Sequence, residues 1–346
     1  MNESGILTPP NESVRPGDPP GGRAWQQALR EAIRDPRELC RLLKLSPEHE
    51  AAAVRAAGAF GLFAPRGYAA LMRVGDPHDP LLRQVLPVGE ELAEAPGFAA
   101  DPVGDAAATL HAGLLQKYQG RALMVTTGAC AVHCRYCFRR HYPYSEGPHS
   151  LAEWEPALKR LAADASIDEV LLSGGDPLTL VDSWLARLAE RLAKIGHLRR
   201  LRVHTRLPIV IPERVCDELL AWLRGTRLAP IVLVHANHPA EISPAVEAAL
   251  GRLVDAGIPV LNQAVLLRGV NDDADVLAEL CRRLVDLRVM PYYLHQLDRV
   301  QGAAHFEVPE ETGRRLIAEL RRRLPGYAVP RYVRETTGEL SKSVLA

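Results

Sequence analysis

The sequence lacks an excess of charge of either sign, because 42 Lys and Arg residues balance 42 Asp and Glu residues. General binders of nucleic acid or of membrane surfaces carry a basic excess, so neither class is indicated. No apolar run is long enough to span a bilayer, and residues 1–23 contain no apolar signal core. We therefore expect a cytoplasmic protein that binds neither nucleic acid nor membrane.

Cysteine is scarce, with six residues in 346, and aromatic residues make up only 5% of the chain. Cys40, Cys216 and Cys281 are scattered through helix-like sequence, where they are best interpreted as small buried hydrophobic residues in a reducing compartment. Hydrophobic residues at 47% and charged residues at 24% are typical of a globular protein with an ample core.

The other three cysteines are Cys130, Cys134 and Cys137, a C-x3-C-x2-C motif that follows an apolar run. Thiolates this close repel one another unless a metal binds them. Three thiolates cannot complete a structural zinc tetrahedron, but they can hold a [4Fe–4S] cluster and leave one iron open for a ligand. The alternative is a zinc site that His133 or His141 completes.

The chain divides into four expected regions. Residues 1–23, rich in Pro and Gly, are expected to form a flexible tail, and residues 24–115 a helical region that caps the catalytic part. Residues 116–308 are expected to form an α/β domain, followed by a C-terminal helix and tail over 309–346.

Within the α/β region, short apolar runs alternate with amphipathic helical segments. Six strands are predicted, at 122–126, 169–173, 201–204, 231–235, 260–265 and 289–294. Helices are predicted at 181–195, 212–224, 243–256, 275–287 and 309–324. The apolar strands favour a parallel sheet covered by helices, either a (β/α)6 partial barrel or a doubly wound sheet. We favour the partial barrel because polar, chemistry-capable residues follow nearly every strand.

Two of these strand ends are informative. Ser173-Gly174-Gly175-Asp176 follows the second strand, and its glycines would let backbone groups approach a ligand closely. The same residues could instead form a plain strand-to-helix turn that begins at Asp176. His204 and Arg206 lie at the end of the third strand. They could bind a ligand there, or they could belong to a salt-bridge network on the rim.

The cysteine spacing, with Tyr136 before the last cysteine, resembles the radical S-adenosylmethionine (SAM) superfamily. The segment that ends at Lys342 resembles the pyridoxal phosphate (PLP) lysine region of the lysine 2,3-aminomutase family within it. The resemblance runs from about Asp79 to Lys342 in ordered stretches, at 130–140, 173–178, 206–210, 235–239, 261–272 and 290–294.

The resemblance implies a radical SAM (β/α)6 partial barrel with three cofactors. The three cysteines would ligate the [4Fe–4S] cluster. The 173–176 motif would hold the amino group of SAM, and His204 and Arg206 would contact its nucleoside or carboxylate end. Lys342 would bind PLP covalently, because a primary amine is the side chain that does so reversibly. The residues that would embrace PLP are Lys117, Tyr118 and Arg121.

The resemblance also assigns the substrate groups. Arg139 would pair with the substrate carboxylate, which a planar guanidinium binds bidentately. Asp298 and Glu335 would bind the side-chain ammonium of lysine, although the family normally has Asp at the second position. The implied reaction is a radical 1,2-amino shift that converts L-lysine to (R)-β-lysine, with a one-electron reductant such as flavodoxin or ferredoxin.

The chain's end at Ala346 and the stretch Gln301–Phe306 are similar to a short subgroup of the family. Its product is attached to translation elongation factor P by a separate lysine ligase, so we expect a functional link to that ligase. Two alternatives stay open. One is an aminomutase for another amino acid such as glutamate, against which the two carboxylates argue. The other is a non-catalytic zinc or iron–sulfur binding module.

Overall fold

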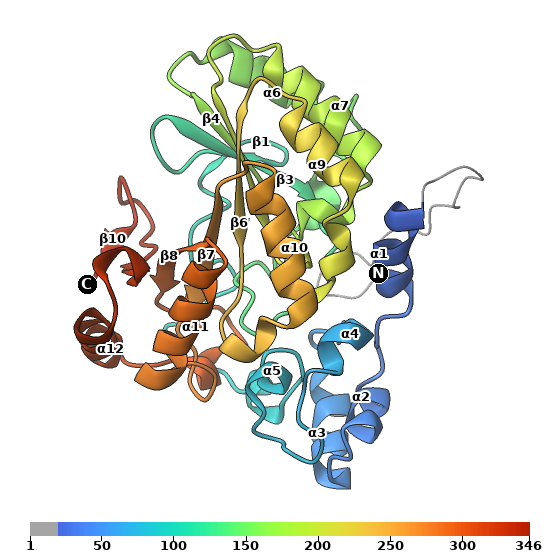
Figure 1. The fold of residues 1–346 in the computed structure, drawn as a ribbon, viewed down its shortest axis with the longest axis vertical. Coiled ribbons are helices and arrows are strands. Elements are labelled where there is room, and N and C mark those ends of the chain that lie inside the picture. Colours follow the sequence, from blue (N-terminus) through green and yellow to red (C-terminus); the bar gives the residue numbers. More distant parts are fainter. Residues whose placement is uncertain (1–19) are drawn as a thin grey trace.

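The computed structural model describes residues 20–346, with side chains from Ala24 onward (Figure 1). Residues 1–19, which hold most of the predicted flexible tail, lie outside the described part. Within it, no helix has the length and apolar character needed to cross a membrane.

The first part of the described chain is helical. Its helices are α1 (Pro20–Arg30), α2 (Pro36–Leu42), α3 (Pro47–Ala56), α4 (Arg66–Ala69) and α5 (Pro80–Arg83). Side-chain caps fix several of their starts: Asp35 accepts a hydrogen bond from Arg37 N, and Asp79 accepts from Leu81 N and Leu82 N. Helices α2 to α5 gather at one end of the molecule, at the bottom of Figure 1.

A ten-stranded sheet forms the centre, and its strands follow one another in chain order from β1 to β10. The strands are β1 (Thr109–His111), β2 (Leu114–Leu115), β3 (Arg121–Thr127), β4 (Glu169–Gly174), β5 (Arg200–Thr205), β6 (Ala229–Val234), β7 (Val260–Val265), β8 (Met290–His295), β9 (Arg331–Arg334) and β10 (Ser343–Val344). Strands β3 to β9 are parallel, whereas β1, β2 and β10 add antiparallel pairs at the two edges.

Helices join the parallel strands. They are α6 (Glu155–Ala163), α7 (Asp182–Ala193), α8 (Leu207–Val210), α9 (Asp217–Arg224), α10 (Pro244–Asp255), α11 (Ala274–Asp286) and α12 (Glu310–Arg323). A doubly wound sheet needs a reversal of strand order to place helices on both faces, and this order has none. Right-handed crossovers in one direction keep the helices on one face, as in a partial barrel. The predicted α/β fold, with a parallel sheet that follows N-terminal helices, is confirmed.

Helix α7 shows how the sequence pattern becomes packing. The apolar face of this helix is buried, with Leu185, Leu188 and Leu192 fully enclosed and Trp184 packed against the same core. Burying each such leucine contributes about 1.5–3 kcal/mol. The covering helix therefore holds the sheet in the shape that brings its strand ends together.

The six predicted strands are present, and β9 adds a seventh parallel strand that the sequence analysis missed. Arg331–Arg334 is only four residues long and half basic, so it has no apolar run to indicate a strand. Its pairing with β8 brings the next residue, Glu335, to the same rim as the other strand ends. Strand β10 then turns back and places Lys342 beside that rim.

Candidate active site

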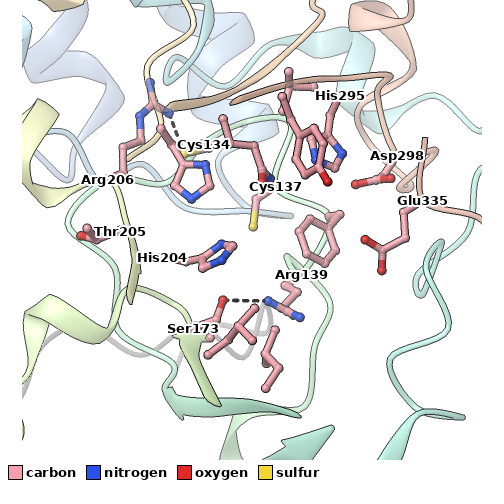
Figure 2. Close-up of a pocket in the computed structure, with 18 of the residues that line it drawn as sticks. Cys134, Cys137, Arg139, Ser173, His204, Thr205, Arg206, His295, Asp298 and Glu335 are labelled. Atoms are coloured by element: carbon pink, nitrogen blue, oxygen red, sulfur yellow. Dashed lines mark hydrogen bonds between the residues drawn. The ribbon is translucent and has the colours of Figure 1, made fainter. Parts of the chain in front are cut away.

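One cavity of about 450 Å³ lies at the C-terminal ends of the parallel strands. All sixteen residues predicted for the cluster, SAM, PLP and substrate line this cavity. The structure thus brings them together, although they come from segments between Lys117 and Lys342. Its size falls within the range of about 300–1,000 Å³ that small-molecule sites have. Figure 2 shows part of its lining.

The three cysteines lie on the loop that follows β3. Burial raises the pKa of Cys130 well above its usual range and that of Cys137 to about 11. Since a metal ligand must be a thiolate, a bound cation would have to supply the charge that stabilises these sulfurs.

Each histidine of the zinc alternative has one ring nitrogen within hydrogen-bond distance of a backbone carbonyl oxygen. The Nδ1 atom of His133 lies 2.9 Å from Gly61 O, and its ring stacks on Phe60 at 5.1 Å. The Nε2 atom of His141 lies 3.3 Å from Gln301 O. His141 does not line the active-site cavity, so it is not placed to complete a metal site there, whereas His133 lines the cavity and its Nε2 atom has no hydrogen-bond partner in the described part of the chain.

The glycines of the 173–176 motif pack against the cysteine loop. Gly174 has φ +124°, and a Cβ there would lie 2.6 Å from Thr127 O. A Cβ on Gly175 would lie 2.2 Å from Ala129 O. The Gly175 N–H donates to Thr127 O at 2.7 Å. Because glycine has no side chain, the backbone of the cysteine loop can pack directly against the end of β4.

Asp176 acts in the structure as the predicted turn residue. Its carboxylate accepts hydrogen bonds from Leu178 N at 3.0 Å, Thr205 Oγ1 at 2.8 Å and Arg206 N at 2.6 Å. Burial raises the pKa of Asp176 to about 6, against the opposing effect of these donors. The carboxylate therefore fastens the end of β4 to the end of β5.

Arg206 lies in a buried network, which is one of its two predicted roles. Its Nη2 donates to Glu241 Oε1 at 2.6 Å and Gln84 Oε1 at 2.7 Å. Its Nη1 donates to Tyr136 Oη at 2.6 Å and to Cys134 Sγ at 2.7 Å, the contact drawn in Figure 2. The guanidinium thus places a fixed positive charge beside the sulfur of Cys134.

The opposite end of the cavity carries the amine groups. Lys342 Nζ forms an ion pair with Glu335, whose other oxygen lies 2.7 Å from Lys117 Nζ. Burial would raise the pKa of Glu335, but the two lysines outweigh it and lower the pKa. The Arg121 guanidinium lies 4.7 Å from the centre of the Tyr118 ring. Lys117, which shares Glu335 with Lys342, and Arg121 both line the cavity, and cations of this kind suit a phosphate-bearing ligand.

Arg139 is buried and paired with a residue that the sequence analysis missed. Its Nε donates to Asp105 Oδ2 at 2.6 Å, and its Nη1 donates to Ser173 Oγ at 3.1 Å (Figure 2). Asp105 also pairs with Lys117 at 2.7 Å. Burial would raise the pKa of Asp105, but Arg139 and Lys117 outweigh it and lower the pKa to about 2. Asp105 lies in irregular sequence before β1, where no motif or periodicity indicates it.

Asp298, which follows β8, differs from the paired carboxylates of Asp105 and Glu335. Its own carboxylate forms no hydrogen bond or ion pair within residues 20–346. Burial in the cavity wall and the neighbouring Glu335 raise its pKa to about 7. Two carboxylates close together disfavour a second negative charge. A ligand cation would relieve this cost.

Three imidazoles, from His204, His235 and His295, line the same cavity, with His204 and His295 labelled in Figure 2. Burial lowers the pKa of His235 to about 4 and lowers the pKa values of His204 and His295 well below their usual range, so all three are neutral. The Nε2 atoms of His204 and His295 have no hydrogen-bond partner in the described part of the chain. Buried polar atoms of this kind normally have one, so they fit a site built for a polar ligand.

The chain matches the radical SAM superfamily over residues 124–281. It is 45% identical to L-lysine 2,3-aminomutase of Escherichia coli, and the match covers 94% of this chain and 95% of that relative. It is 42% identical to the Haemophilus influenzae protein of the same name, covering 93% and 95%. The protein of that name from Clostridium subterminale is 34% identical, and 91% of this chain matches 76% of it. Among solved structures, that of SuiB from Streptococcus suis matches with TM-score 0.49 and 12% identity over 64% of this chain and 50% of that one.

Proposed function

Because the chain belongs to the lysine 2,3-aminomutase family of radical SAM enzymes, we propose that it is an L-lysine 2,3-aminomutase that makes (R)-β-lysine. Such an enzyme is an isomerase, since it moves the amino group of lysine from C2 to C3. One observation carries the proposal. A single cavity is lined both by Cys130, Cys134 and Cys137 and by Lys342, so radical and amine chemistry can meet on one substrate.

The lining fits three cofactors. The cysteines would hold a [4Fe–4S] cluster, and SAM would lie against the 173–176 motif, His204 and Arg206. Lys342, Lys117, Tyr118 and Arg121 would hold PLP. When bound, the cluster and SAM supply radical chemistry, and PLP supplies the conjugated system through which nitrogen migrates.

The charged side chains would orient the substrate between these groups. Arg139, from the cysteine loop, would bind the carboxylate of lysine. Asp298 and Glu335, at the ends of β8 and β9, would face its ammonium. Lys117 and Lys342 already neutralise Glu335, so Asp298 would carry most of the ammonium's pairing. The enclosing strand ends would keep water from the reacting carbons.

Three further expectations belong to this proposal. Cleavage of SAM consumes one electron, so a reductant such as flavodoxin or ferredoxin would dock near the cluster. The product would pass to the lysine ligase that modifies translation elongation factor P, which the near full-length match to the Escherichia coli relative supports. Both steps would take place in the cytoplasm.

Anaerobic incubation tests the proposal directly. The reconstituted protein receives SAM, PLP and dithionite with either L-lysine or L-glutamate, and the products are separated on a chiral column. We expect (R)-β-lysine from L-lysine and no β-amino acid from L-glutamate. β-Glutamate as the main product would refute the lysine assignment, and SAM cleavage without any β-amino acid would refute the aminomutase assignment.

A further inference from the structure

A second cavity, of about 350 Å³, adjoins the active-site cavity. It lies between the loop that carries residues 100–113 and the segment 138–147. Asp105, Phe138 and Arg139 line both cavities, so these three residues form the wall that separates them. The wall includes the guanidinium to which the substrate carboxylate is assigned.

The charge of the second cavity matches the substrate. Its acidic and basic side chains are Asp101, Asp105, Glu146, Arg139 and His141, and burial raises the pKa of the sixth ionisable group, Tyr142, so that it stays neutral. Asp105 and Arg139 compensate each other, and burial lowers the pKa of His141 and keeps that imidazole neutral. Asp101 and Glu146 then leave the cavity negative, whereas lysine carries a net positive charge at neutral pH.

The ion pair in this wall, between Arg139 and Asp105, can exchange its anion for another carboxylate. Arg139 needs an anion because it is buried, with 7% of its side chain exposed, and Asp105 provides one. An incoming carboxylate can replace Asp105 on the guanidinium while Asp105 stays paired with Lys117 at 2.7 Å. In the exchanged arrangement both Arg139 and Asp105 would keep an oppositely charged partner, so neither buried charge would be left alone.

From these observations we propose that the second cavity is the entrance for the cationic amino acid substrate, with the Asp105–Arg139 ion pair as its inner gate. The substrate's carboxylate takes the place of Asp105 on Arg139 as it passes into the active-site cavity. This inference rests on the proposed function for the identity of the substrate. The proposed function concerns only the active-site cavity, whereas this inference adds a route into that cavity and a gate on the route.

The test measures how fast lysine arrives. Holoenzyme with PLP but without SAM is mixed with L-lysine in an anaerobic stopped-flow instrument, and the change in PLP absorbance is followed. Ala106→Trp and Ala112→Trp each place a large side chain in the second cavity, because both alanines are exposed and line it. Ala51→Trp, on the exposed side of α3, is the matched control.

We expect at least one of the two cavity variants to lower the second-order rate about tenfold or more. The equilibrium affinity for lysine should stay within about twofold of wild type, because a narrowed entrance slows binding and release equally. The control should match wild type in both quantities. Wild-type rates in both cavity variants would overturn the entrance.

A charge variant keeps the test valid if the tryptophan variants fail to fold. Glu146→Gln should lower the rate about two- to fourfold at low ionic strength and match wild type at about 1 M salt, where exposed charges are screened. Glu48→Gln on α3 is its control, and equal rates for the two variants at low salt would overturn the entrance. If wild type gives no absorbance change with L-lysine, the proposed function itself fails. A normal wild-type response with unslowed variants refutes only the entrance.

Discussion

Replacing Asp298 by Asn is the sharpest test of how the substrate ammonium is held. The carboxylate forms no ion pair within the described residues, so its loss strands no protein cation. Asn has nearly the same shape and keeps one carbonyl oxygen. The variant therefore removes one negative charge that only the substrate would use, and its fold should be unaffected.

The size of the effect follows from the charge-assisted hydrogen bond that is lost. Such a bond is worth up to about 3 kcal/mol, and at 1.36 kcal/mol per factor of ten this predicts a loss of about a hundredfold in kcat/KM for lysine. Glu335 pairs with Lys117 and Lys342 in this structure, so it offers an ammonium less uncompensated charge than Asp298 does.

The raised pKa of Asp298 adds a pH signature. Below its pKa of about 7 the carboxyl becomes protonated, whereas the lysine ammonium stays charged throughout. The wild-type kcat/KM should therefore fall as the pH drops through about 7, approaching tenfold per unit, because this parameter reports ionisations of the free enzyme. Asp298→Asn should lose this dependence.

The assay is initial-rate formation of β-lysine under anaerobic conditions between pH 6 and pH 8, with SAM cleavage measured in parallel. Asp272→Asn is the matched control, because Asp272 is an aspartate outside the cavity lining. Normal lysine turnover by Asp298→Asn would show that the ammonium is held elsewhere. An unchanged pH profile would refute the link to the Asp298 pKa.

The other predictions concern the cofactor residues and Glu335. Cys134→Ala should abolish iron loading and SAM cleavage in a soluble protein, measured by iron analysis and product chromatography; full SAM cleavage would rule out its ligand role. Lys342→Ala should lose the borohydride-trapped PLP adduct while uncoupled SAM cleavage can persist, and peptide mapping that finds the adduct on Lys117 would contradict this. Glu335→Asp should keep or raise turnover of lysine, because it retains a carboxylate beside Lys342. Glu335→Gln should lower turnover and weaken PLP binding, since it leaves two partly buried lysines with less compensation. Equal activity of the two variants would count against this role.

The C-terminal segment shows most clearly where sequence reasoning stopped. Resemblance implied that Lys342 binds PLP and that Glu335 faces the substrate ammonium, and the structure places both in the cavity lining. It could not show how they arrive there, since strand β9 is four residues long and exists through its pairing with β8. Short strands depend on their neighbours more than on their own composition.

The sequence by itself determined the local features of this protein. The cysteine spacing, the apolar periods of the six predicted strands and the amphipathic face of α7 are properties of residues close together in the chain, so they are readable without a fold. Only the tertiary structure decided which distant groups meet. Asp105 binds Arg139 across 34 positions, and Lys117 binds Glu335 across 218. Such pairs leave no periodic trace, because they depend on the order of strands in the sheet, which long-range packing selects.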